Sequence, residues 1–373
     1  GFEIVHRCQF MGLKGMQNGL LRFNNVKVPK ENIIWGLGKG LKLALVTLNT
    51  GRLTVPAACS AMAKKSLIIA RDWANKRIQW GAPIGHHETI ASKISLMTAT
   101  TFAMDSVTWF SSALVDRGNA DIRLEAAMAK LYCTEAAWRI ADDTVQIRGG
   151  RGYETADSLK ARGEEPIPEE RFMRDCRINL LIEGTSEIMR LFIAREAMDP
   201  HLKRILPILS PKTSLMGKLS KMIQAFGFYA LWVPAQWMAF FNPGCPTPLS
   251  GKLKGHVRTV TKMSHKLARE IFQAMVVHQQ GLEKRQKMLA RFVDIGTDLF
   301  VMLSACSRAA SLMKQDSSDR SPEELADLFC REAVLRIQKE FRSLRQNDDK
   351  IVYKVGRSML EGRYKWLETG IIK

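Results

Sequence analysis

Apolar side chains recur at helical spacing from residue 40 to about residue 199, and this periodicity constrains the fold more than any other feature of the chain. The pattern is broken at Gly81-Ala82-Pro83 and at Gly149-Gly150, where glycine and proline are typical of helix ends. Two of the expected helices cover about residues 87–115 and 121–147. Long helices joined by short connections predict an antiparallel bundle.

Other patterns flank and interrupt this bundle. Short apolar runs followed by turns in residues 1–37, such as Leu20–Phe23 and Val26–Val28, are typical of β-strands, and a lone hairpin is not stable by itself. Residues 253–373 return to helical spacing, whereas the polar stretch 154–170 predicts a surface loop. The chain is therefore predicted to be mostly α, with an antiparallel helical bundle preceded by a remnant of a β-domain and followed by a second helical domain.

The positive charge of the chain is concentrated in its second half. The sequence has 56 Lys and Arg against 37 Asp and Glu, a formal net charge of +19. Residues 1–200 hold 27 basic and 22 acidic side chains, whereas residues 201–373 hold 29 and 15. Such an excess favours an anionic partner for the second half: nucleic acid, an anionic membrane or a phosphate-rich ligand. Lys262, Lys266 and Arg269 lack any nucleic-acid fold signature around them, so no nucleic-acid partner is expected.

The seven cysteines are scattered along the chain. They form no C-x-x-C pair and show no His/Cys ligand spacing. This pattern indicates reduced thiols inside a cell and predicts neither a disulfide framework nor a metal site. The first residues also lack the basic and apolar runs of a signal peptide.

An uncharged stretch of 20 residues, Met222 to Phe241, contains seven aromatic side chains and is flanked by lysines. Aromatic residues favour a membrane interface, and lysines favour anionic headgroups. Twenty residues can span a bilayer, but Gly227 and Pro234 interrupt the run. The pattern favours a helix or helical hairpin lying in the interface, and a buried helix at a domain or dimer contact and a true span remain the alternatives.

The string Ile182-Glu183-Gly184-Thr185 places a carboxylate directly before a helix start. Thr185 is suited to cap the helix. Glu183 lies among apolar residues, and apolar surroundings raise the pKa of a carboxylate toward the range of a general base. On spacing alone, a plain helix start with an acid placed to suit the helix dipole is the more frequent interpretation.

Four motifs occur in order along the chain: Arg77–Ile84, Gln146–Tyr153, Met173–Asp175 and Ile182–Thr185. Together with the opening strands they closely resemble the C-terminal half of the acyl-CoA dehydrogenases, over about residues 1–200. The resemblance implies a flavin enzyme with FAD that forms a trans-2,3 double bond in a fatty acyl-CoA. It also implies a homodimer and an electron-accepting flavoprotein or other acceptor.

The same resemblance assigns roles to individual residues. Glu183 matches the family's base, which removes the α-proton while the β-hydrogen leaves as hydride to the flavin. Some members place this base on the earlier helix, directly before an arginine; here that position is Gly51, which cannot act as a base. Arg52 matches the arginine near the substrate. The positions expected to contact FAD are Arg77, Trp80, Gln146, Gly149, Gly150, Thr185 and Glu187.

Physical chemistry suits several of these roles. The guanidinium of Arg77 matches phosphate oxygens bidentately, and in the family this residue reaches across the dimer interface. Glycines at 149 and 150 permit a close approach of the backbone to the adenosine part. The plain structural alternatives are core packing for Trp80, a helix cap for the glycines and a solvated charge for Arg52.

The segment Leu48–Arg52 and the long tail resemble the very-long-chain members, whose added helical domain holds the enzyme to a membrane. We therefore expect a long-chain substrate and an intracellular location, cytoplasmic with peripheral attachment to an anionic membrane, or at the mitochondrial inner membrane in a eukaryote. The chain is expected to be a C-terminal fragment that lacks the N-terminal domain. The alternative is a non-catalytic, membrane-binding helical module derived from the family.

These expectations divide the chain into four parts. They are the end of a β-barrel-like middle domain (1–37), the dehydrogenase C-terminal bundle (38–200), a basic and aromatic membrane-associating segment (201–252) and a C-terminal helical domain (253–373).

Overall fold

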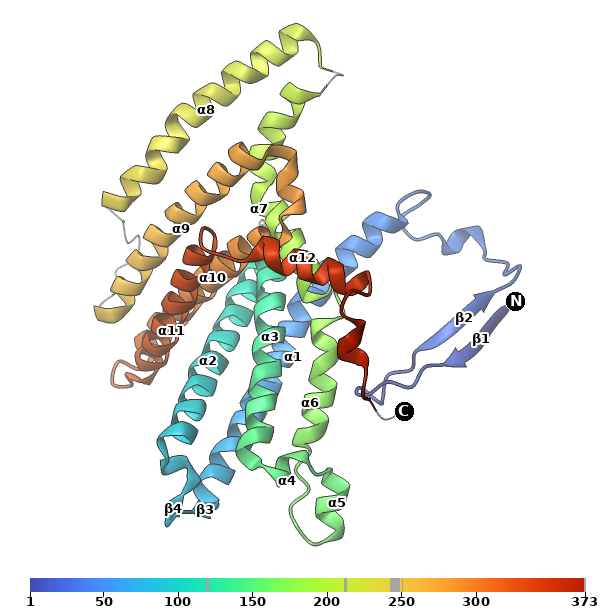
Figure 1. The fold of residues 1–373 in the computed structure, drawn as a ribbon, viewed down its shortest axis with the longest axis vertical. Coiled ribbons are helices and arrows are strands. Elements are labelled where there is room, and N and C mark those ends of the chain that lie inside the picture. Colours follow the sequence, from blue (N-terminus) through green and yellow to red (C-terminus); the bar gives the residue numbers. More distant parts are fainter. Residues whose placement is uncertain (119–120, 211–212, 242–248, 250, 372–373) are drawn as a thin grey trace.

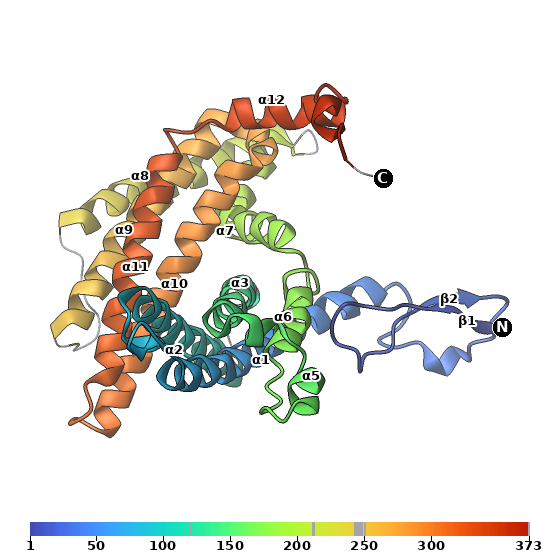
Figure 2. The same cartoon turned by 60° about the horizontal axis from the view of Figure 1, so that its bottom comes forward.

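The computed structural model of the chain describes residues 1–118, 121–210, 213–241, 249 and 251–371. Helices dominate it, which confirms the mostly α fold (Figure 1). Two strands, β1 (Phe2–Arg7) and β2 (Gly19–Phe23), pair antiparallel near the N-terminus. This hairpin and the short helix η1 (Lys30–Asn32) project to one side of the helices (Figure 2). Its apolar side chains are exposed, so it buries little surface of its own.

The bundle is built around three long helices. They are α1 (Gly40–Lys76), α2 (Glu88–Asp116) and α3 (Arg123–Arg148), and the last two begin and end within about two residues of the predicted bounds. Between α1 and α2 lie the two-residue strands β3 (Ile78–Gln79) and β4 (Ala82–Pro83) and the helix η2 (Ile84–His86). Among the described residues, α1 is the one helix long and apolar enough to cross a membrane, and it packs against α2 and α3.

Shorter elements complete the first half. They are α4 (Gly150–Tyr153), α5 (Ala156–Ala161), α6 (Glu169–Arg177) and η3 (Ile178–Leu180). The expected surface loop at 154–170 thus contains a helix, because the Thr155 hydroxyl accepts the backbone N–H of Ser158 and caps α5. The helix α7 (Ser186–Leu209) follows and continues through Pro200 and Pro207, so residue 200 lies within a helix.

The second half is also helical. It consists of α8 (Leu215–Phe241), α9 (Gly251–His278), η4 (Gln279–Lys284), α10 (Gln286–Gln315), α11 (Ser321–Ser343), α12 (Asp349–Leu360) and η5 (Lys365–Glu368). The helix α8 is one continuous helix, which contradicts a helical hairpin at 222–241. Pro234 lies inside this helix, which packs against α7 and α9.

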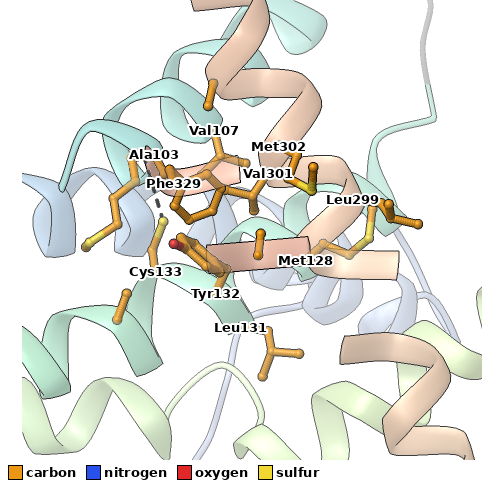
Figure 3. Packing of buried hydrophobic residues seen from close by; sticks show 14 of the residues in the cluster. Ala103, Val107, Met128, Leu131, Tyr132, Cys133, Leu299, Val301, Met302 and Phe329 are labelled. Atoms are coloured by element: carbon orange, nitrogen blue, oxygen red, sulfur yellow. Dashed lines mark hydrogen bonds between the residues drawn. The ribbon is translucent and has the colours of Figure 1, made fainter. Parts of the chain in front are cut away.

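The two helical regions share one core. Side chains of α2 and α3 pack against α10 and α11, and the ring of Tyr132 meets that of Phe329 edge-on at 6.0 Å between centroids (Figure 3). On α3, alanines such as Ala127, Ala129 and Ala137 are fully buried, and their small size lets neighbouring helices approach closely. The C-terminal helices are therefore packed onto the bundle rather than appended to it.

Candidate active site

Glu183 lies in an unusual turn between η3 and α7. Its φ is 56° and that of Gly184 is 101°, so two consecutive residues adopt left-handed backbone. A non-glycine residue in this region costs about 1 kcal/mol or more and is enriched at functional sites. Thr185 caps the helix that follows, because its hydroxyl accepts the backbone N–H of Ile188 at 3.4 Å. The turn thus fixes where the Glu183 carboxylate points.

The carboxylate of Glu183 lies directly against Gly51 on α1. A Cβ atom on Gly51 would be 2.4 Å from Oε1 and 2.6 Å from Cδ of Glu183, so a larger residue would collide with it. Gly51, the position on the earlier helix where some members of the resembled family place the base, therefore lies next to Glu183. The oxygen Oε2 is buried and has no hydrogen-bond partner in the part of the chain that the structure describes. A buried acceptor in that state is available to a ligand.

Arg52 brings a positive charge to the same place. Its guanidinium lies 4.6 Å from the centre of the Phe192 ring on α7. Burial lowers the pKa of Arg52, while the carboxylates of Glu183 and Glu196 act in the opposite direction. The predicted base and the predicted substrate arginine are thus neighbours at the contact between α1 and α7.

Lys130 is a member of this cluster that the sequence analysis missed. The side chain is fully buried on α3, and its Nζ donates to the carbonyl oxygen of Gly184 at 2.7 Å. Burial lowers its pKa to about 8, opposed by Cys59 and Glu183. The available signal was one lysine among the alanines that form the buried face of α3, where a solvated charge would be out of place.

A separate cleft of about 480 Å³ brings together three of the residues expected to contact FAD, namely Arg77, Gly149 and Gly150. It is lined by Trp73, Arg77, Gln79, Ile84, Ile147, Arg148, Gly149, Gly150, Arg151, Glu154 and Arg162. Gly149 has φ 62°, which favours glycine, and ends α3. With four arginines at its lining, the cleft suits an anionic group.

Salt bridges and a buried acid organise the walls of this cleft. Arg151 binds both carboxylate oxygens of Glu164, at 2.7 and 2.9 Å, so the α5 region is tied to the cleft. Behind it, Glu169 is fully buried and accepts the hydroxyl of Ser66 at 3.1 Å. Burial raises the pKa of Glu169 to about 7, while the Ser66 hydrogen bond and Arg148 act against this shift.

The other predicted FAD contacts lie elsewhere. Trp80 is 90% exposed, at the turn between β3 and β4, and meets His87 edge-on at 5.6 Å between ring centroids. Gln146 is exposed near the end of α3, and its backbone carbonyl accepts the N–H of Gly149. Thr185 and Glu187 lie at the start of α7, where the backbone and the Thr185 hydroxyl lower the pKa of Glu187.

The Met173–Asp175 motif has a structural role that the sequence did not reveal. The Arg174 guanidinium donates to the carbonyl of Met11 at 2.8 Å, and the backbone N–H of Leu13 donates to Asp175 Oδ1 at 2.5 Å. These bonds join α6 to the connection between β1 and β2. The motif therefore attaches the N-terminal hairpin region to the bundle.

Comparison with known proteins agrees with this architecture. Residues 38–198 match the family described as "Acyl-CoA dehydrogenase, C-terminal domain", and residues 251–361 match "ACAD9/ACADV, C-terminal domain". The chain is 48% identical to the "Probable acyl-CoA dehydrogenase FadE10" of Mycobacterium tuberculosis over 100% of its own length and 57% of the relative. It is 29% identical to the human "Very long-chain specific acyl-CoA dehydrogenase, mitochondrial", over 90% of the chain and 50% of the relative.

A solved structure shows the same fold. The acyl-CoA dehydrogenase from Bacillus anthracis, complexed with FAD, superimposes with a TM-score of 0.74 at 24% identity and covers 95% of this chain and 59% of that one. The chain thus spans little more than half the length of the proteins that it matches. On the matched domains, it belongs to the acyl-CoA dehydrogenase family and carries the family's C-terminal helical domain followed by the tail domain of the ACAD9/ACADV type.

Proposed function

We propose that this chain supplies the catalytic base of a flavin-dependent dehydrogenase that converts long-chain fatty acyl-CoA to trans-2-enoyl-CoA. The observation that carries the proposal is the Glu183 carboxylate, held by a left-handed turn against Gly51 with one oxygen that has no partner among the described residues. A general base needs a fixed position and a free acceptor oxygen. Arg52 lies beside it and brings a positive charge to the site.

FAD is the cofactor that the family implies, and residues of this chain fit it. The cleft that contains Arg77, Gly149 and Gly150 offers guanidinium groups for phosphate oxygens and a backbone without side chains for a close approach. When bound, FAD supplies the acceptor for the hydride that leaves the β-carbon. Glu183 takes the α-proton, and the chain's own groups orient the substrate. We further propose a homodimer and an electron-accepting flavoprotein or other acceptor as the partner in reoxidation.

The flavin spectrum tests this function directly. The polypeptide containing this chain, loaded with FAD, should lose its visible flavin absorption when a long-chain acyl-CoA is added without oxygen. Glu183→Gln should keep the flavin band and lose the bleaching, because it removes the base and leaves the cleft intact. Glu361→Gln, at an exposed position that directly follows α12, is the matched control and should bleach like the wild type.

Two outcomes would count against this function. Bleaching that survives Glu183→Gln would show that the base is misassigned. Folded protein that binds no flavin and sediments with anionic vesicles would favour the non-catalytic membrane-binding module. A series of acyl-CoA substrates tests the long-chain preference, and preferential bleaching by short chains would contradict it.

We also propose that α8 attaches the protein peripherally to an anionic membrane, in the cytoplasm or at the mitochondrial inner membrane of a eukaryote. One face of α8 packs inward, where Tyr229 stacks on His201 of α7 at 5.8 Å between ring centroids. The outer face is apolar and exposed, with Leu215 at 86%, Phe226 at 77% and Leu231 at 79%. A helix buried on one side and apolar on the other suits an interface better than a span.

Vesicle sedimentation tests this attachment. The protein should sediment with phosphatidylglycerol vesicles, sediment less with phosphatidylcholine vesicles, and lose binding at high salt. Phe226→Asp should weaken binding, because it places a charge on the outer face of α8. Leu335→Asp introduces the same charge at an exposed apolar position of α11 and is the control. Equal losses for both variants would assign the effect to net charge and contradict a docking role for α8.

A further inference from the structure

Lys130 is a fully buried cation that the proposed reaction has not yet used. Burial of an ammonium group is costly unless nearby groups compensate for its lost hydration. No salt bridge within 4.0 Å joins Lys130 to a carboxylate in the described part of the chain, in contrast to Arg190 on the neighbouring α7. A lysine kept in such a place needs a specific contact to explain it.

That contact is the carbonyl of Gly184. The Lys130 Nζ donates to this oxygen at 2.7 Å from α3, 54 residues away in sequence. Gly184 follows Glu183 directly, and both have left-handed backbone. Two consecutive residues in this region do not hold their conformation without outside support. The lysine therefore fixes the peptide that orients the Glu183 side chain.

Electrostatics links the same two residues. The titratable and charged groups that face Lys130 are Arg52 and Cys59 from α1, Glu183 from the turn and Glu135 on its own helix. Burial lowers the pKa of Lys130 to about 8, so below that pH the ammonium form persists and attracts the Glu183 carboxylate. The Cys59 thiol stays neutral there, because burial raises its pKa to about 12.

We propose that Lys130 is a positioning residue for the base, which locks the Glu183-Gly184 turn through its hydrogen bond to the Gly184 carbonyl. The expected effect on catalysis rests on the proposed function. The support of the turn by Lys130 involves only residues of this chain and can be tested without the reaction. Lys130 acts through Glu183 and need not touch substrate.

Two substitutions separate the charge from the hydrogen bond. Lys130→Met keeps an unbranched side chain one atom shorter and removes both the ammonium and the donor. Lys130→Gln keeps an N–H donor and removes the charge, and it serves if the methionine variant fails to fold. Cys133→Ala, which loosens the buried face of the same helix without touching the turn, is the structural control.

The primary readout is the infrared carboxyl band of Glu183, identified as the band that Glu183→Gln removes. This measurement needs neither flavin nor turnover. In Lys130→Met the band should shift and broaden, because the turn that holds the carboxyl group has lost its hydrogen bond. Lys130→Gln, which keeps a shorter donor, should change the band less than Lys130→Met does, and Cys133→Ala should lower the thermal stability and leave the band in place.

The FAD-loaded polypeptide gives the second readout. In Lys130→Met the maximal bleaching rate should fall roughly tenfold, because the base is no longer held in place, with little change in the KM for acyl-CoA. An unchanged infrared band in both lysine variants, or an equal change in Cys133→Ala, would overturn the inference. If Glu183→Gln still bleaches, the proposed function fails while the infrared band still decides the role of Lys130.

Discussion

Gly51→Ala is the substitution for which the structure makes the sharpest prediction. The new Cβ would lie 2.4 Å from Glu183 Oε1, whereas ordinary contacts of such an atom begin at 3.4 Å, so the carboxylate must move by about 1.0 Å. A displacement of this size at a reacting group costs about a hundredfold in rate. We therefore expect acyl-CoA bleaching of the flavin to slow by about that factor.

Stability should respond less than activity does, or in the opposite direction. Gly51 lies within α1, and replacement of glycine by alanine inside a helix contributes about 1 kcal/mol of stability before the strain of the displaced carboxylate is subtracted. Stopped-flow bleaching and thermal unfolding of one preparation measure both effects. A loss of activity without a matching loss of stability distinguishes a displaced base from general damage to the fold.

Gly255→Ala is the matched control for this experiment. It is also a helical glycine, on α9, and a Cβ there would meet nothing within 4 Å. We expect a small gain in stability and an unchanged bleaching rate. If Gly51→Ala bleached within about threefold of the wild type, well short of the expected loss, the assignment of the base beside Gly51 would be refuted.

Two further substitutions test the electrostatics of the fold. Burial raises the pKa of Glu169 to about 7, so the folded protein holds a proton that the unfolded chain releases above about 4.5, and this group lowers stability as pH rises from about 4.5 to 7. Glu169→Gln should remove this decline. In urea unfolding, its unfolding free energy should exceed that of the wild type by up to about 3 kcal/mol at pH 8 and should not exceed it at pH 4. A difference that is constant across pH would contradict the argument. Arg190 binds Glu135 at 2.7 Å and Asp294 at 2.8 Å, so Arg190→Met should cost about 2–4 kcal/mol of unfolding free energy, because two carboxylates lose their cation. A cost under about 0.5 kcal/mol in the same assay would show that this cluster does not join α3, α7 and α10.

Local signals explain why the helices of the bundle could be predicted. Apolar periodicity and glycine stops are properties of neighbouring residues, so the bounds of α2 and α3 agree within about two residues. The helix α5 was missed inside the polar stretch 154–170, because a six-residue helix has too few turns to show a periodicity. The shared core of the two helical regions was missed for a different reason: it joins residues far apart in sequence.

The site could be predicted only in part. The resemblance assigned Glu183 and Arg52, but nothing in the sequence shows that Gly51 provides the space into which the carboxylate fits, since the two lie on separate elements. Lys130 escaped notice because a charged residue on a helix is usually solvated, and its burial depends on how α3 packs against the turn before α7. Trp80 is exposed at a hairpin turn, which contradicts the alternative of core packing, and its contact with FAD stays a prediction.

One helix connects the two properties proposed for this chain. The helix α7 begins directly after the Glu183 turn and is 24 residues long, about 36 Å. It packs against α8. Near its far end His201 lies among aromatic rings of α8 and α9, with its Nδ1 3.0 Å from the Tyr229 hydroxyl. The α8 residues proposed to bind the membrane and the Glu183 carboxylate proposed to take the proton are therefore connected through α7. Most of the length of α7 separates them. A substitution on the outer face of α8 should consequently change vesicle binding without changing the chemical step. A substitution at His201, which contacts rings of α8 and α9, should affect the attachment of α8 first.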